Sequence, residues 1–149
     1  MFLEEFEPGK IFTTGELLVT QERIDEFASL TGDLNPLHID EAFASGTIFK
    51  RTIAHGMLVF SLALGLWYEA GFTRQSVVAF LGLNEVKFRA PVFPGMRIRV
   101  SSRVKAARVS ESRPDSGIVT FEDSIVNESG ELVATFERTL LLRKKDATL

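Results

Sequence analysis

The sequence predicts an α+β fold in which an antiparallel β-sheet wraps a long, apolar central helix. Residues 56–70 form a helix-length segment that is apolar nearly all round. The chain after about residue 77 is rich in Val, Ile, Thr and Phe and is interrupted only by short turn motifs. Long strands joined by short turns pair in the antiparallel sense. Because a helix without a polar face must be enclosed on all sides, we expect the sheet to curl around it.

The strands are bounded by turn-forming residues. Pro94-Gly95, the segment 114–117 (PDSG) and Ser129-Gly130 separate stretches of alternating or β-branched composition. The expected strands are residues 77–89, 97–109, 118–127 and 132–143, and residues 17–20 are also strand-like.

The N-terminal third is expected to be helical and then irregular. Thr20 can cap a helix whose apolar residues follow helical spacing up to Gly32, which acts as a stop. Proline disfavours the helical conformation in the residue before it, so the Asn35-Pro36 pair predicts an ordered loop over residues 33–37. Residues 41–45 are expected to form a short helical turn.

Composition narrows the class of protein. The chain has 149 residues, 45% hydrophobic and 25% charged, which is typical of one globular domain, here taken as residues 1–149. It has no cysteine, which is consistent with a reducing compartment. A net charge of -3 gives no basic surface for nucleic acid.

No targeting or membrane segment is expected. The first ten residues, MFLEEFEPGK, are acidic where a secretion signal would be basic. The longest apolar run, residues 57–68, is shorter than the roughly 18 residues needed to span a bilayer. We therefore expect no contact with a membrane and a cytoplasmic location.

Few side chains in this sequence can exchange protons near neutral pH. There is no Cys, and the only two histidines, His38 and His55, follow Asp33 closely. A carboxylate and an imidazole held together can share one water molecule and move its protons, so Asp33 and His38 are candidate catalytic residues. Asp33 and the Asn35-Pro36 pair could instead serve only turn formation, and His38 could be structural.

Two further kinds of chemistry are less well supported. A metal site could be drawn from Asp33, His38, Asp40 and His55, but the sequence has neither thiolates nor the paired histidines of metalloprotease helices, so no metal is expected. Ser61 lies within the apolar helix without the turn motif of a nucleophilic serine.

The start of the apolar helix is a second candidate region. His55-Gly56-Met57 opens the helix, where free N-H groups favour negative charge. Glycine allows close approach of a ligand, and an enolate oxygen formed from a thioester could accept the Gly56 N-H. Gly56 could equally be only an N-cap.

Three motifs in order resemble the MaoC-like hotdog-fold dehydratases, which include (R)-specific enoyl-CoA hydratases: residues 32–38 (GDLNPLH), 54–57 (AHGM) and 87–95 (KFRAPVFPG). The resemblance covers nearly the whole chain. It implies the hotdog fold, a homodimer or dimer of dimers, and an acyl-CoA thioester as substrate without any cofactor other than this CoA. It also implies catalytic roles for Asp33 and His38 and an oxyanion role for the Gly56 N-H. Supporting or substrate-binding roles fall to Asn35, His55, Met57 and Ser61.

The expected activity is the reversible hydration of trans-2-enoyl-CoA to (R)-3-hydroxyacyl-CoA. A thioesterase of the same fold, directing water to the carbonyl carbon, is one alternative, and a non-catalytic acyl-CoA binding module is another. The sequence gives neither the acyl chain length nor the choice between CoA and an acyl carrier protein.

Overall fold

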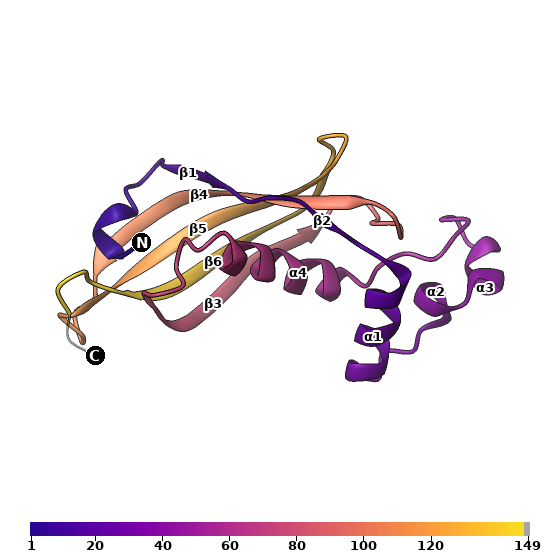
Figure 1. Cartoon of the computed structure of the whole chain (residues 1–149), viewed down its shortest axis with the longest axis horizontal. Helices are drawn as coiled ribbons and strands as arrows, with labels where there is room; N and C mark the ends of the chain where they lie inside the picture. The colour runs from indigo at the N-terminus through magenta and orange to yellow at the C-terminus, as the bar shows by residue number, and fades with distance from the viewer. Residues whose placement is uncertain (148–149) are drawn as a thin grey trace.

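A computed structural model describes residues 1–147. Its helices and strands follow the order expected from the sequence, with three short elements added: a 3-10 helix and a three-residue strand near the N-terminus, and the four-residue helix α2 (Figure 1). The elements are η1 (Leu3–Glu5), β1 (Ile11–Thr13), β2 (Leu17–Leu18), α1 (Gln21–Thr31), α2 (Pro36–Ile39), α3 (Glu41–Ser45), α4 (Gly56–Glu69), β3 (Val77–Phe88), β4 (Arg97–Val109), β5 (Ser116–Asn127) and β6 (Leu132–Arg143).

The four long strands form one antiparallel sheet, as predicted. The order across the sheet is β1-β4-β5-β6-β3, and β2 pairs with β4 beyond the end of β1. The hairpins β4-β5 and β5-β6 are nearly in register throughout, whereas the pairing of β3 with β6 contains three register shifts. In the strand order, β3 stands at one edge of the sheet and pairs only with β6.

Helix α4 lies along one face of the curved sheet (Figure 1). From Gly117 onward the residues of β5 alternate between buried and half-buried, which is the period-2 pattern of a strand with one face in the core. The inward-facing apolar residues of the strands pack against α4 in a core whose largest fully buried side chains include Phe121, Ile98, Ile125 and Leu142. The α+β arrangement is thus confirmed.

The expectation that α4 is enclosed on all sides is wrong for the single chain. Met57, Ser61, Gly65 and Tyr68 are exposed along one side of the helix, and Met57 and Tyr68 are 48% and 57% exposed. These four residues are spaced three or four positions apart, so they form one stripe on the side of α4 that turns away from the sheet. Within residues 1–147 of one chain, nothing covers that stripe.

The segment from α1 to α3 extends past the end of the sheet (Figure 1). Thr20 caps α1 through its side chain, and Gly32 ends the helix with a left-handed φ of 78°, as the sequence predicted. The loop expected over residues 33–37 is shorter than predicted, because α2 begins at Pro36. Proline at the first helical position loses no hydrogen bond there, since that N-H has no partner within the helix.

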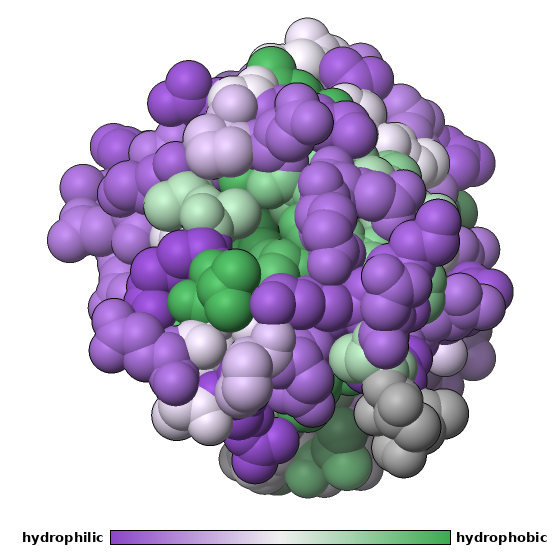
Figure 2. Space-filling model, turned by 90° about the vertical axis from the view of Figure 1, so that its left-hand side faces the viewer, coloured by the Kyte–Doolittle hydropathy of each residue, from purple (hydrophilic) through white to green (hydrophobic). Residues whose placement is uncertain are grey.

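The surface at the opposite end, where the N-terminus lies, presents mainly hydrophilic side chains with apolar groups showing between them near the middle (Figure 2). Among the described residues, no helix has the length and apolar character needed to cross a membrane.

Candidate active site

The loop that carries Asp33 and His38 is shaped by short-range hydrogen bonds. After Gly32 turns the chain out of α1, the Asp33 side chain accepts a long bond of 3.4 Å from the N-H of Asn35. The Asn35 side chain in turn caps α2 by accepting the Leu37 N-H at 3.0 Å. This capping places Asp33 and His38 on either side of one tight turn. A supporting role of Asn35 in the reaction stays a prediction.

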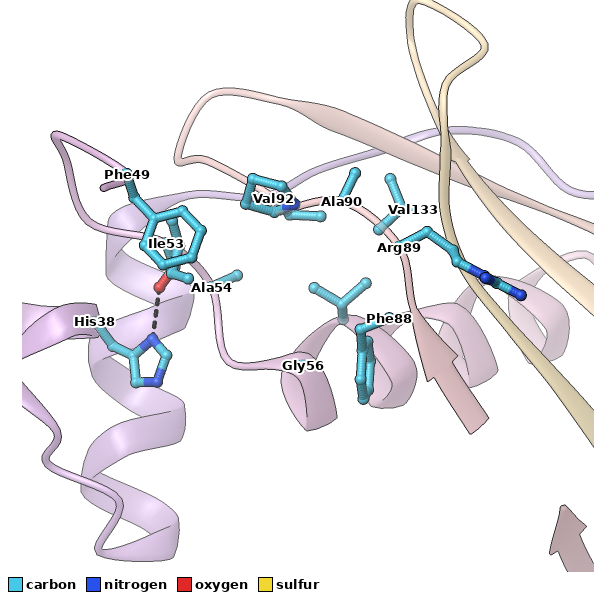
Figure 3. A pocket seen from close by; sticks show the side chains of 12 residues that line it. His38, Phe49, Ile53, Ala54, Gly56, Phe88, Arg89, Ala90, Val92 and Val133 are labelled. Carbon is cyan, nitrogen blue, oxygen red and sulfur yellow. Dashed lines mark hydrogen bonds between the residues drawn. The ribbon is translucent and has the colours of Figure 1, made fainter. Parts of the chain in front are cut away.

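His38 is oriented by the main chain around it. Its Nδ1 lies 2.8 Å from the carbonyl oxygen of Ile53 (Figure 3). A carbonyl oxygen can only accept, so Nδ1 carries the hydrogen and a neutral His38 keeps a lone pair on Nε2. The side-chain amide of Gln21 also donates to the His38 carbonyl oxygen at 2.8 Å, which ties α2 to the start of α1. His38 therefore offers a proton-accepting nitrogen in a fixed orientation.

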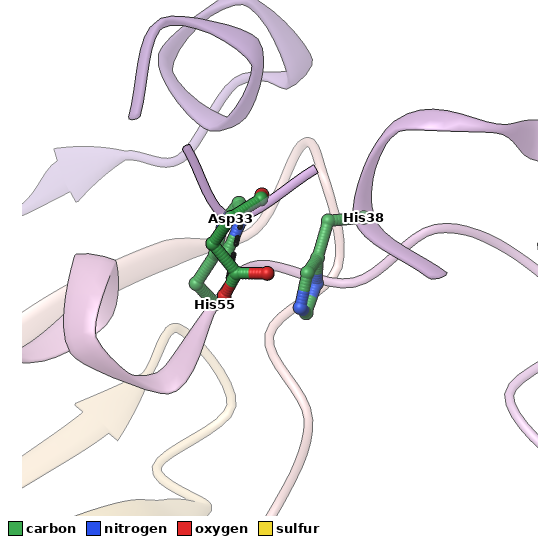
Figure 4. Close-up of side chains that lie close together, drawn as sticks. All are labelled: Asp33, His38 and His55. Atoms are coloured by element: carbon green, nitrogen blue, oxygen red, sulfur yellow. Dashed lines mark hydrogen bonds and ion pairs between the residues drawn. The ribbon is translucent and has the colours of Figure 1, made fainter. Parts of the chain in front are cut away.

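His55 lies beneath the pair and is 3% exposed. Its Nε2 is 3.1 Å from the main-chain oxygen of Asp33 and 4.0 Å from the nearer carboxylate oxygen (Figure 4). Its ring stacks on that of His38 with centroids 3.8 Å apart and meets Phe27 edge-on. Asp33, by contrast, has a side chain that is 55% exposed and can reach solvent or a ligand.

The same three residues are the group that could hold a metal ion, with one possible ligand atom each and all three atoms within 4.8 Å of one another. Imidazole binds a metal through a lone pair in the plane of its ring. The stacked rings of His38 and His55, tilted by only 30°, do not direct such lone pairs at one point. Asp40, the fourth residue considered, caps α3 instead. This arrangement fits a metal poorly.

A cavity of about 380 Å³ opens beside this cluster (Figure 3). His38 forms part of its wall on one side, and Gly56 at the start of α4 forms part of it on another. Most of the remaining wall is apolar. The lining residues are His38, Phe49, Ile53, Ala54, Gly56, Val59, Phe88, Arg89, Ala90, Pro91, Val92 and Val133.

Gly56 is the first residue of α4, and His55 rather than Gly56 is the N-cap. The reading of Gly56 as only an N-cap is therefore wrong. The N-H groups of the first turn of a helix have no carbonyl partner within the helix, so the N-H of Gly56, a residue that lines the cavity, has none within α4. The tip of the Phe88 ring packs against Gly56 where a side chain would otherwise stand.

Two of the expected substrate-binding residues are placed differently. Met57 and Ser61 belong to the exposed stripe of α4, and neither lines the cavity. The Ser61 hydroxyl donates to the Met57 carbonyl oxygen at 2.7 Å, a common helical bond of serine. A substrate-binding role for either residue stays a prediction.

Several cavity residues were not identified from the sequence as parts of a site. Phe49 and Ile53 come from the loop between α3 and α4, and Val133 comes from β6. Phe88 and Arg89 fall within the motif 87–95. The motif alone does not show that the end of β3 lies against the start of α4, which is what brings these two residues to the cavity.

Comparison with known proteins gives a consistent family assignment. The family model described as MaoC like domain matches residues 5–124. The (R)-specific enoyl-CoA hydratase of Aeromonas caviae is 39% identical over 116 residues, which are 78% of this chain and 81% of that protein.

Solved structures agree in fold. A monoamine oxidase regulatory protein from Archaeoglobus fulgius superposes with a TM-score of 0.87 at 38% identity, covering 97% of this chain and 95% of that one. A Mycobacterium tuberculosis protein described as having a double hotdog fold superposes with a TM-score of 0.85, covering 100% of this chain and 46% of that one. At 19% identity this second likeness shows the fold alone. The fold is the predicted hotdog fold.

Proposed function

The chain belongs to the MaoC-like domain family, and we propose that it adds water reversibly to trans-2-enoyl-CoA to form (R)-3-hydroxyacyl-CoA. The observation that carries the proposal is the position of His38, which borders an apolar cavity with a lone pair free on Nε2, close to the carboxylate of Asp33. The (R) configuration is proposed from the name of the Aeromonas caviae relative.

The reaction needs one water molecule and one acid/base pair. In the proposed site the Asp33 carboxylate and the His38 Nε2 both accept hydrogen bonds from the water. The water oxygen bonds to C3 of the enoyl group, one water proton passes to the pair, and the pair returns a proton to C2. The site then ends each turnover in the state in which it began, and the reverse sequence removes water.

The N-terminus of α4 would stabilise the intermediate. Attack at C3 pushes the electrons of the double bond toward the thioester oxygen, which gains negative charge until C2 is protonated. The Gly56 N-H and the positive end of the helix dipole are well suited to that charge. Because the N-H is fixed before the reaction, no group needs to reorganise as charge develops.

The proposed substrate matches the chemistry of the cavity. Its apolar walls, including Ile53, Val59 and Val133, suit an acyl chain, while His38 and the main chain of Gly56 place polar groups at its border. The proposed reaction involves no redox change and uses no metal, and coenzyme A enters only as part of the substrate. The choice of CoA over an acyl carrier protein belongs to the proposal.

We also propose that two chains pair through β3. This strand is 12 residues long and lies at the sheet edge, and its apolar residues Val77, Val78, Phe80 and Leu81 are each nearly half exposed. Soluble proteins seldom leave such an edge open, because it invites further strand pairing. A second copy paired there would supply hydrogen-bond partners for the open edge of β3.

The proposal is tested with crotonyl-CoA. We would follow the loss of enoyl thioester absorbance, the release of free CoA thiol and the chirality of the 3-hydroxyacyl product. The expected result is mainly (R)-3-hydroxybutyryl-CoA with little free thiol. Rapid thiol release without a hydroxyacyl product would make the protein a thioesterase, and tight binding without either product would make it a binding module.

A further inference from the structure

We propose that His55 is a positioning residue, which holds Asp33 in place for His38 through an N-H bond to the main chain of Asp33. The inference rests on the proposed hydration reaction, because it assigns His55 a part in that site. Its basis is the burial of His55, the direction of its hydrogen bond and the weakness of the other contacts that hold Asp33.

His55 joins three segments of the chain. It is the N-cap residue of α4, its ring packs edge-on against Phe27 of α1 at 4.9 Å, and it stacks on His38 of α2 at 3.8 Å. With only 3% of its surface exposed, the imidazole is enclosed on nearly every side. A side chain held by three elements can serve as a fixed reference for the loop beside it.

The hydrogen bond to Asp33 fixes which nitrogen of His55 carries a hydrogen. The Asp33 carbonyl oxygen can only accept, so Nε2, at 3.1 Å, is the donor. Nδ1 is buried and has no partner among the described residues. His38 has the opposite arrangement, since its Nδ1 donates to Ile53. A neutral His55 therefore donates its one N-H to the main chain of Asp33. The Nε2 lone pair of His38 is left to accept a hydrogen bond from the substrate water.

The other contacts of Asp33 are weak. Its N-H reaches the Thr31 hydroxyl at 3.3 Å, and its carboxylate accepts the Asn35 N-H at 3.4 Å, both at the long end for hydrogen bonds. The segment also carries mostly exposed side chains. The bond from His55 is the shortest of the three, and it is the only one whose partner is itself buried.

Loss of this bond should misplace Asp33 without removing it. Misplacement of a reacting group by about 1 Å can cost on the order of 10²-fold in rate. His55 does not line the cavity, so loss of its hydrogen bond should lower kcat and leave KM largely unchanged.

Two substitutions separate the hydrogen bond from the packing. His55→Phe keeps a ring that can stack on His38 and pack on Phe27 but has no N-H. His55→Gln loses the ring but keeps an amide N-H that can reach the position of Nε2. We expect His55→Phe to lower kcat for crotonyl-CoA hydration about 10²-fold. His55→Gln should stay within about 10-fold of wild type, on the view that the bond matters more than the ring.

A second measurement does not depend on activity. Hydrogen exchange of the peptide covering residues 32–38 should be faster in His55→Phe than in wild type, and close to wild type in His55→Gln. The assignment is overturned if His55→Phe keeps wild-type kcat and exchange, or if His55→Gln is as impaired as His55→Phe in both. Wild type could fail to hydrate crotonyl-CoA while the hydrogen-exchange rates of residues 32–38 in the two variants follow the expected order. In that case the proposed function is wrong, but His55 still positions Asp33.

Discussion

The ring of Phe88 occupies the space that a side chain on Gly56 would need. A Cβ built on Gly56 would lie 2.8 Å from Cζ of Phe88 and 3.0 Å from Cε1 and Cε2. Phe88 is the last residue of β3, so the contact joins the edge strand to the first turn of α4. The absence of a side chain at Gly56 thus lets the strand, the helix and the cavity meet at one point.

The first prediction concerns the Gly56 N-H. Gly56→Ala and Gly56→Pro both add a Cβ that meets Phe88, but only proline removes the N-H. The backbone accepts proline here, because Gly56 is the first helical residue and His55 already has the extended conformation, with φ -59° and ψ 137°, preferred before proline. We expect kcat of Gly56→Pro to be about 10²- to 10³-fold below that of Gly56→Ala.

The effect of the added methyl group is measured separately in the Phe88→Ala background. If the methyl group acts by pushing the ring, Gly56→Ala should be less harmful to kcat there than in the wild-type background, giving a clear coupling in a double-mutant cycle. Equal activity of Gly56→Pro and Gly56→Ala would remove the N-H from the mechanism.

The second prediction concerns the acid/base pair. Asp33→Asn keeps an oxygen that can accept the Asn35 N-H, and His38→Asn keeps an amide N-H that can reach the Ile53 carbonyl in place of Nδ1. Each variant should therefore fold normally while losing its proton acceptor. We expect kcat for hydration to fall by about 10²- to 10⁴-fold in each. If a variant with a native circular dichroism spectrum keeps wild-type kcat, the residue has no acid/base role.

The parts of the fold that the sequence predicted are those governed by local pattern. The long strands alternate with period 2 or carry β-branched runs, α4 is apolar over most of its length, and Thr20 and Gly32 mark the ends of α1 by their own chemistry. Strand β2 falls within the strand-like residues 17–20, whereas β1 was not predicted, because its three residues are too few for a period to show. Helix α2 was not predicted at all, because Pro36 ends a helix in one context and begins one in another.

The candidate site likewise has a part that the local sequence predicts and a part that depends on non-local packing. Asp33 and His38 are five positions apart on one turn, so their proximity follows from the sequence. The contact of Phe88 with Gly56 joins residues 32 positions apart and depends on how β3 lies against α4. The partner of His55 is a main-chain oxygen, for which no side-chain pattern exists. Non-local packing and main-chain acceptors were what the sequence could not supply.

The third prediction concerns assembly. Wild type should have the mass of a dimer, or of a dimer of dimers, by light scattering at micromolar concentration. Phe80→Glu places a charge on the exposed apolar edge of β3, where Phe80 is 47% exposed, and should shift the protein toward monomers. Ile11→Glu is the matched control, since Ile11 is 61% exposed and lies on β1, at the opposite edge of the sheet from β3. A monomeric wild type, or equal dissociation by both variants, would contradict pairing through β3.

The last prediction concerns a buried ion pair in the core. Asp123 and Arg138 are each 2% exposed and joined by two hydrogen bonds, of 2.7 Å from Nε and 3.2 Å from Nη2. The Ser102 hydroxyl also donates to the carboxylate. The guanidinium group lies 4.3 Å from the centre of the Trp67 ring of α4. The charges are thus satisfied within the core only while both partners are present.

Removing one partner should cost much more than removing both. Arg138→Met leaves the carboxylate buried without its cation and should lower the free energy of unfolding by about 3–5 kcal/mol. The double variant Asp123→Leu/Arg138→Met replaces the pair with apolar groups and should recover much of that loss, because no charge is left unpaired.

Arg103→Met is the matched control. Arg103 pairs with Glu122 on the solvent side of the sheet, where the two side chains are 58% and 42% exposed. Loss of this exposed pair should lower the free energy of unfolding by at most about 1 kcal/mol. Urea unfolding at one fixed protein concentration measures all three, since pairing of chains makes stability depend on concentration. If Arg138→Met is no more destabilising than Arg103→Met, the core does not depend on this pair.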